Sequence, residues 1–231
     1  MFERSIASGD GSQRSSLLPA SPESGASTAA RLGFAPVRLA SVTRSLLSPL
    51  GPAADVGVQA ADQLERDAPA NLDVWIVLEG GGESLHEGMR SFVRSRRKDF
   101  DARQTFVLAI DSVGRGDVRF QPSAGWVVSY RMDRRMVELS EAIATADAGN
   151  DDQYGAAGFA TGLGGAATVA AAAGWRPLGI TCLDADGYVA NRHLPADTPK
   201  AVNHAALDRA HGFALELIRR LDADVGRGTK R

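Results

Sequence analysis

The sequence predicts one α/β domain with a mostly parallel central sheet covered by helices on both faces. Three short, nearly all-apolar runs, at residues 73–78, 105–110 and 177–183, are typical of buried strands. Helical patterns separate these runs, and strands that are apolar on both sides occur where helices cover both faces of a sheet. The chain has 231 residues, of which 44% are apolar, and this is enough for one domain with a sizeable core.

The predicted domain covers residues 31–223. Residues 1–30 are rich in Ser, Ala, Gly and Pro without periodicity, so we expect a disordered tail there. Residues 224–231 end in GRGTKR and are predicted to form a second tail.

The elements of the domain follow from periodicity and from turn residues. An amphipathic pattern predicts a helix over residues 56–67, ahead of the first buried strand. A helix is also expected over residues 84–97, because Ser84 is a suitable N-cap and Glu87, three residues on, completes a capping-box pattern. The other expected elements are shorter strands at 118–120 and 126–130 and helices at 132–146, 167–174 and 201–221.

Charge and composition limit the partners that the chain is expected to have. The formal net charge of −2 gives no reason to expect nucleic acid, and the basic run at residues 94–98 is interpreted as a solvated helix end. No apolar run approaches the roughly 18 residues of a membrane span, and the N-terminus lacks the apolar segment of a secretory signal. We therefore expect a cytoplasmic protein without a membrane span, whose oligomeric state the sequence leaves open. The single cysteine, Cys182, lies in an apolar run and is predicted to be a buried structural thiol.

Polar residues follow the three buried strands at the point where each strand ends. GGGES (80–84) follows the first strand, DSVG (111–114) the second, and a long polar loop the third. Ligands of such sheets bind at the carboxyl ends of the strands. Glu83, Asp111 and His193 would bring carboxylates and an imidazole together there, which are ligands of divalent metals. The alternative is that each one is a cap or a solvated group.

Two phosphate-binding alternatives are less favoured. GGGESLHEG lacks the lysine of a phosphate-binding loop, and Glu83 and Glu87 would repel a phosphate. GLGGAA (162–167) fits a dinucleotide-binding pattern, with Asp184 placed 22 residues after Gly162 as a ribose-binding acid. However, the strand that should precede this pattern is replaced by the polar, glycine-broken segment DDQYGAAGFAT.

The motifs together resemble the zinc aminopeptidase family known as metallopeptidase family 28. They are GESLHEGMRSF (82–92), FVLAIDSVG (106–114) and RHLPADTP (192–199), which stand in the family order, and the resemblance extends over about residues 55–221. The pattern of these motifs looks most like that of a bacterial branch of the family. The resemblance implies a three-layer fold of the phosphorylase and hydrolase type. It also implies that Glu83, Asp111 and His193 bind zinc. Asp197 would orient His193, or would cap the loop ahead of Pro199.

The sequence departs from the family pattern at three positions. Gly82 stands where the family has its general base, and a glycine cannot take a proton from a metal-bound water. Asp55 is the one carboxylate near the bridging position, and no histidine precedes His86. The resemblance therefore implies a metal site that is truncated or degenerate, holding one zinc ion rather than two, or none.

Two functions follow from this resemblance. The first is a zinc-dependent aminopeptidase that removes residues from peptide N-termini, with the general base missing. The second is a non-catalytic pseudopeptidase whose pocket binds a peptide or a partner protein.

Overall fold

The computed structural model describes residues 5–6, 37–43, 52–150, 152–162 and 164–228, with side chains from Val56 onward. These residues form a seven-stranded sheet in the order β1-β3-β2-β4-β9-β5-β8. All pairs from β1 to β9 are parallel, whereas β5 runs antiparallel to β9. The strands are β1 (Ser5–Ile6), β2 (Val37–Thr43), β3 (Leu72–Glu79), β4 (Thr105–Ile110), β5 (Asp117–Gln121), β8 (Ala157–Gly158) and β9 (Arg176–Leu183).

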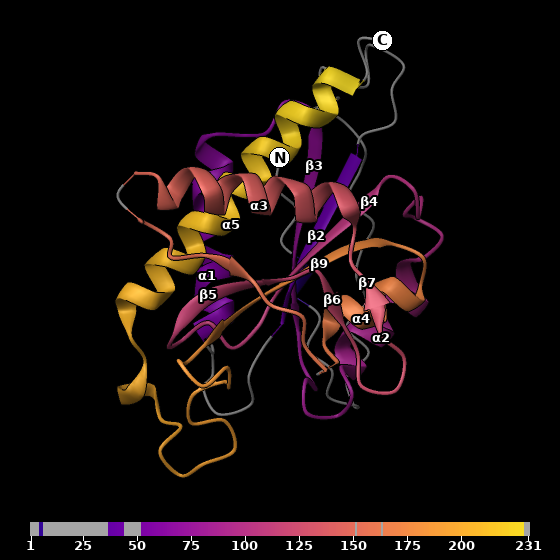
Figure 1. The fold of residues 1–231 in the computed structure, drawn as a ribbon. Helices are drawn as coiled ribbons and strands as arrows, with labels where there is room; N and C mark the ends of the chain where they lie inside the picture. Colours follow the sequence, from indigo (N-terminus) through magenta and orange to yellow (C-terminus); the bar gives the residue numbers. More distant parts are fainter. Residues whose placement is uncertain (1–4, 7–36, 44–51, 151, 163, 229–231) are drawn as a thin grey trace.

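Helices cover both faces of the sheet, as predicted. α1 (Pro52–Arg66) and α5 (His204–Gly228) lie on one side, and α2 (Glu87–Arg96) and α4 (Ala166–Ala172) lie on the other (Figure 1). α3 (Arg134–Ala148) packs against α5 and β5, and a 3-10 turn (Pro199–Ala201) precedes α5. The predicted fold class is thereby confirmed. None of the helices in the described ranges is both long and apolar enough to cross a membrane.

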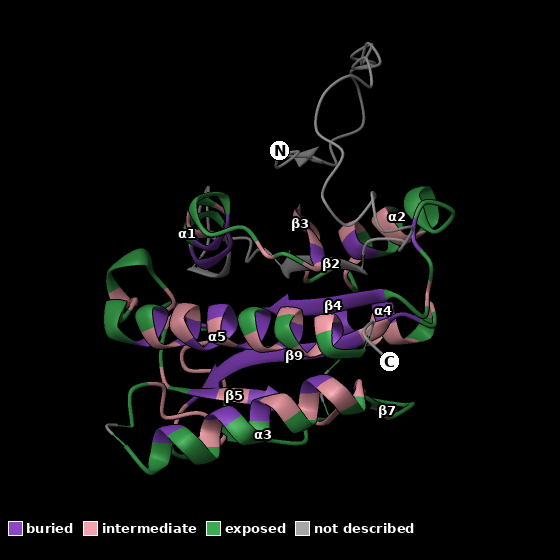
Figure 2. Ribbon diagram, turned by 90° about the horizontal axis from the view of Figure 1, so that it is seen from above, coloured by how far each residue is buried: buried purple, intermediate pink, exposed green. Residues whose placement is uncertain are grey.

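The core is built on the central strands and on one face of α5. β4 is buried at all six positions, and Figure 2 shows the same for most of β9. Phe213, Leu217 and Leu221 are fully buried on the side of α5 that faces the sheet. Cys182 is also buried, and desolvation raises the pKa of its thiol to about 12. It is therefore an inert structural thiol at neutral pH, as expected.

Several elements differ from the predicted ones. The predicted strand at residues 126–130 is wrong: β6 (Ser123–Ala124) and β7 (Tyr130–Arg131) pair as a short hairpin, and 125–129 form its turn. Gly125 causes the reversal, since its φ of +133° is strained for any other residue. α5 continues to Gly228 and buries Val225, so it includes residues assigned to the C-terminal tail. The predicted N-terminal tail lies outside the described residues except at β1, which pairs with β3.

Candidate functional site

Three loops at the carboxyl ends of β3, β4 and β9 carry most of the backbone strain of the domain. Among the described residues, six residues other than glycine have positive φ, and five of them lie in these loops. They are Leu85, His86, Ser112, Asn191 and His193, with φ between 56° and 61°. Such conformations cost free energy and cluster where a site must be held in one geometry. The strain therefore marks this edge of the sheet as the candidate site.

The loop after β3 turns back on itself before α2 begins. The amide of Gly88 donates to the carbonyl oxygen of Gly80 at 3.0 Å, and Gly81 has a φ of +71°. The predicted helix start at Ser84 is wrong, because residues 82–85 form a turn and α2 begins at Glu87 with His86 as its N-cap. A left-handed residue cannot continue a right-handed helix, so the φ of 57° at His86 moves the start to the next residue.

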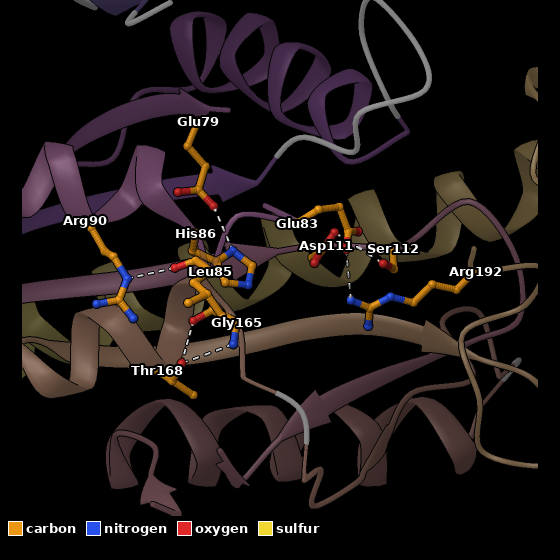
Figure 3. Close-up of polar contacts among 10 residues, drawn as sticks. All are labelled: Glu79, Glu83, Leu85, His86, Arg90, Asp111, Ser112, Gly165, Thr168 and Arg192. Atoms are coloured by element: carbon orange, nitrogen blue, oxygen red, sulfur yellow. Dashed lines mark hydrogen bonds and ion pairs between the residues drawn. The ribbon is translucent and has the colours of Figure 1, made fainter. Parts of the chain in front are cut away.

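This reversal brings together two residues that were not predicted to interact. Glu79 is 4% exposed, and its Oε1 lies 3.3 Å from Nδ1 of His86 (Figure 3). Burial lowers the pKa of His86, but the hydrogen bond and charge of Glu79, the charge of Asp111 and the carbonyl of Gly164 outweigh it, so the pKa is raised. The imidazole of His86 thus links β3 to the glycine-rich loop before α4.

Folding stability is expected to fall as pH rises through the folded-state pKa of His86. Because the folded state holds this proton more tightly than the unfolded chain, the contribution is complete below the unfolded value of about 6.5 and is lost above the raised pKa. Urea unfolding at closely spaced pH values measures the loss. His86→Gln should remove this part of the pH dependence, and an unchanged pH profile in that variant would show that another group is responsible.

The loops after β3 and β9 bring Glu83 and His193 into contact. Oε2 of Glu83 lies 3.4 Å from Nε2 of His193. Arg192 contacts both, since its Nε donates to Nε2 of His193 at 3.2 Å and its Nη2 lies 3.8 Å from Oε2 of Glu83. Figure 3 shows the contact of Arg192 with Glu83. The Nε2 lone pair of His193 is therefore engaged by Arg192, and Glu83 already has a cation beside it. Sequence reasoning missed Arg192, whose only signal was its place directly before His193.

The other predicted ligands take separate positions. Asp111 directly follows β4, and one of its carboxylate oxygens accepts a hydrogen bond from Oγ of Ser112 at 3.3 Å. The hydrogen bonds of the described residues include none between Asp197 and His193, so the orienting role of Asp197 stays a prediction. Asp55 lies in α1, at a position where the side chain is not described.

A cavity of about 620 Å³ opens beside these residues. Asp111, Ser112 and Asp184 contribute polar groups, and Arg192 and His193 line the same space. Its lining also includes the apolar side chains of Phe159, Tyr188 and Leu194, which are 37%, 73% and 57% exposed. Cavities of this size that combine apolar walls with a few polar groups are typical of small-ligand sites.

The described donors do not fit a catalytic zinc ion. Such a site uses three protein ligands and one open position. The separation of Glu83 and His193 suits two of them, since donors on a tetrahedral zinc lie about 3.4 Å apart. However, no three His, Cys, Asp or Glu side chains within the described part of the chain lie close enough to share one ion. The guanidinium of Arg192 also engages both members of the pair.

Comparisons with solved structures find a similar fold in several enzymes at low sequence identity. A zinc aminopeptidase from Bacillus subtilis aligns with a TM-score of 0.62 at 14% identity, over 80% of this chain and 46% of the other. A glutaminyl cyclase from an Acidobacteriales bacterium aligns with a TM-score of 0.59 at 16% identity, over 82% of this chain and 70% of the other. A purine nucleoside phosphorylase from Toxoplasma gondii aligns with a TM-score of 0.52 at 11% identity, over 82% of this chain and 92% of the other.

The sequence comparisons add no closer relationship. No family model and no curated protein matches the chain. The chain spans about half the length of the Bacillus subtilis aminopeptidase that it resembles. It therefore shares the fold of zinc aminopeptidases at low sequence identity, with a mostly parallel sheet flanked by helices.

Proposed function

We propose that this chain is a non-hydrolytic protein of the metallopeptidase-like fold that binds peptides through their free α-amino group. The observation that carries the proposal is the contact of Arg192 with both Glu83 and His193, which engages the two residues best placed to hold zinc. Gly82, at the position of the general base in the family that the sequence resembles, has no side chain to accept a proton. Both features argue against hydrolysis through a metal-bound water.

The cavity supplies groups that suit a peptide N-terminus. Asp111 and Asp184 present carboxylates to it, and one oxygen of Asp111 has no hydrogen-bond partner among the described residues. A carboxylate that accepts from an ammonium group makes a charge-assisted hydrogen bond, about twice as strong as a neutral one. Phe159 and Tyr188 would cover the first apolar side chain of the peptide. The proposed ligand is thus a peptide with a free amino group and an apolar first residue.

Binding of leucyl dipeptides in metal-free buffer tests this function. Isothermal titration calorimetry should show that the free-amine peptide binds at least tenfold more tightly than its N-acetylated form, because acetylation removes the positive charge. Asp111→Asn should cause a similar loss. Asp117→Asn is the matched control, since Asp117 pairs with Arg119 at the start of β5 and does not line the cavity.

Two outcomes would contradict the proposal. Equal affinity for the free and acetylated peptides would show that the amino group is not recognised. Turnover of the peptide that is lost with a chelator and restored by zinc would show that the protein is a hydrolase.

One observation favours a second candidate, a zinc-dependent aminopeptidase. The 3.4 Å between Glu83 and His193 matches the spacing of two ligands on one zinc ion. This candidate requires Arg192 to move away and a third ligand to come from outside the described side chains, for which Asp55 is the residue predicted from the sequence. Its test is the hydrolysis assay just described, with Glu83→Ala as the variant that should abolish turnover.

A further inference from the structure

β6 and β7 pair as a hairpin with a tight turn. Ser123 pairs with Arg131 and Ala124 with Tyr130. The amide of Met132 donates to the carbonyl oxygen of Pro122 at 3.0 Å and so extends the hairpin at its base. The amide of Thr161 donates to the carbonyl oxygen of Ser123 at 3.1 Å and ties the hairpin to the rest of the domain. In the turn, a Cβ on Gly125 would lie 2.0 Å from the carbonyl oxygen of Val128, so only glycine allows the chain to close there. We call residues 125–129 the hairpin tip.

The hairpin tip presents three consecutive apolar side chains to solvent. Trp126 is 87% exposed, Val127 91% and Val128 57%. The neighbouring Tyr130 and Met132 pack against the domain, so the tip is not the edge of an unfinished core. Burying apolar surface contributes about 25 cal/mol of stabilisation for each Å², and side chains left in water do not make this contribution. A held turn that exposes three of them is typical of a contact surface.

The size of the hairpin tip favours a lipid surface over a protein partner. One tryptophan and two valines offer roughly 400 Å² of apolar area. A stable protein interface buries about 800 Å² on each side and needs a complementary shape. A bilayer needs no complementary shape, and tryptophan is enriched at the boundary between lipid and water.

The charges at the base of the hairpin favour an anionic lipid surface. Arg131 is exposed in β7, three residues after Val128. Arg103 is also exposed, and its carbonyl accepts a hydrogen bond from Arg176, which pairs with Asp133 just beyond the hairpin. Within the described residues, neither Arg131 nor Arg103 has an acidic partner. We propose that the hairpin tip inserts into anionic membranes while Arg131 and Arg103 contact lipid phosphates.

Sedimentation of the full chain with lipid vesicles tests the proposal. The protein should bind vesicles of phosphatidylcholine with 30% phosphatidylserine, and its tryptophan fluorescence should shift to shorter wavelength as Trp126 leaves water. Replacing Trp126, Val127 and Val128 together by serine should lower the partition coefficient at least tenfold. Arg131→Glu should lower it at least fivefold, since a cation near an anionic surface contributes that much and the variant also reverses the charge.

Val58→Ser is the matched control, because Val58 is 37% exposed on α1, on the other side of the sheet from β7 (Figure 1). This variant should bind vesicles like the wild type. The proposal is overturned if the wild type binds neither anionic nor neutral vesicles, or if the triple serine variant binds as well as the wild type. A dimer that forms with rising concentration and is lost in the triple variant would also overturn it, because a second copy would then cover the hairpin tip. Peptide binding should be unchanged in all these variants.

Discussion

Gly88→Ala is expected to destabilise the fold by about 2–3 kcal/mol, as overpacking against rigid atoms does. A Cβ at this position would lie 2.3 Å from the carbonyl oxygen of Gly80, 2.8 Å from its nitrogen and 2.9 Å from Cβ of Glu79. These are backbone atoms or a Cβ fixed to the backbone, so they cannot move without opening the turn after β3. Urea unfolding of the wild type and the variant gives the free energy difference.

Gly80→Ala provides the matched control from the same loop. A Cβ on Gly80 meets no atom within 4 Å, and its φ is not positive, so its effect should stay within about 0.5 kcal/mol. If the two alanine variants were equally stable, the close approach of Gly88 to Gly80 would not exist in solution. Because this turn places Glu83 against His193, which lines the cavity, Gly88→Ala should also weaken peptide binding.

Arg192→Ala is expected to raise the affinity for zinc at least tenfold. The variant frees the Nε2 lone pair of His193 and removes a cation from the vicinity of Glu83. A tenfold change requires about 1.4 kcal/mol. A divalent ion about 4 Å from a unit positive charge is repelled by about 2 kcal/mol in water, and the freed lone pair of His193 adds to the gain. Competition with a fluorescent zinc chelator gives the two dissociation constants.

Arg219→Ala tests whether any lost arginine has the same effect. Arg219 pairs with Asp67 away from the cavity, so this variant should bind zinc like the wild type. Adding Glu83→Ala to Arg192→Ala should cancel the gain. If Arg192→Ala bound zinc no better than the wild type, the guanidinium would not be what occupies this pair.

The fold could be predicted from the sequence because its central strands are short, continuous runs of apolar residues. The runs that became β4 and β9 are buried as expected, whereas β3 alternates between buried and half-buried residues. The common direction of the three strands places the three polar loops at one edge of the sheet. This arrangement brings the loops that carry Glu83 and His193 to the same edge of the sheet. β2 was not predicted, although its pairing with β3 and β4 places it in the centre of the sheet.

The details of the site depend on backbone conformations that periodicity does not encode. The sequence places His86 one turn along a helix, but its left-handed conformation directs it to Glu79 instead. Arg192 and His193 are adjacent in sequence, and their contact depends on the φ of 60° at His193. The apolar residues of the hairpin tip have the composition of a strand, and Gly125 turns them into an exposed loop.

The zinc content of the purified wild-type protein tests the central claim most directly. After dialysis against metal-free buffer, mass spectrometry for zinc should find far less than one ion per chain, and the protein should not release amine from aminoacyl anilides when zinc is added. One tightly held zinc ion per chain, with anilide hydrolysis that Glu83→Ala abolishes, would contradict the claim that Arg192 occupies Glu83 and His193 in place of a metal.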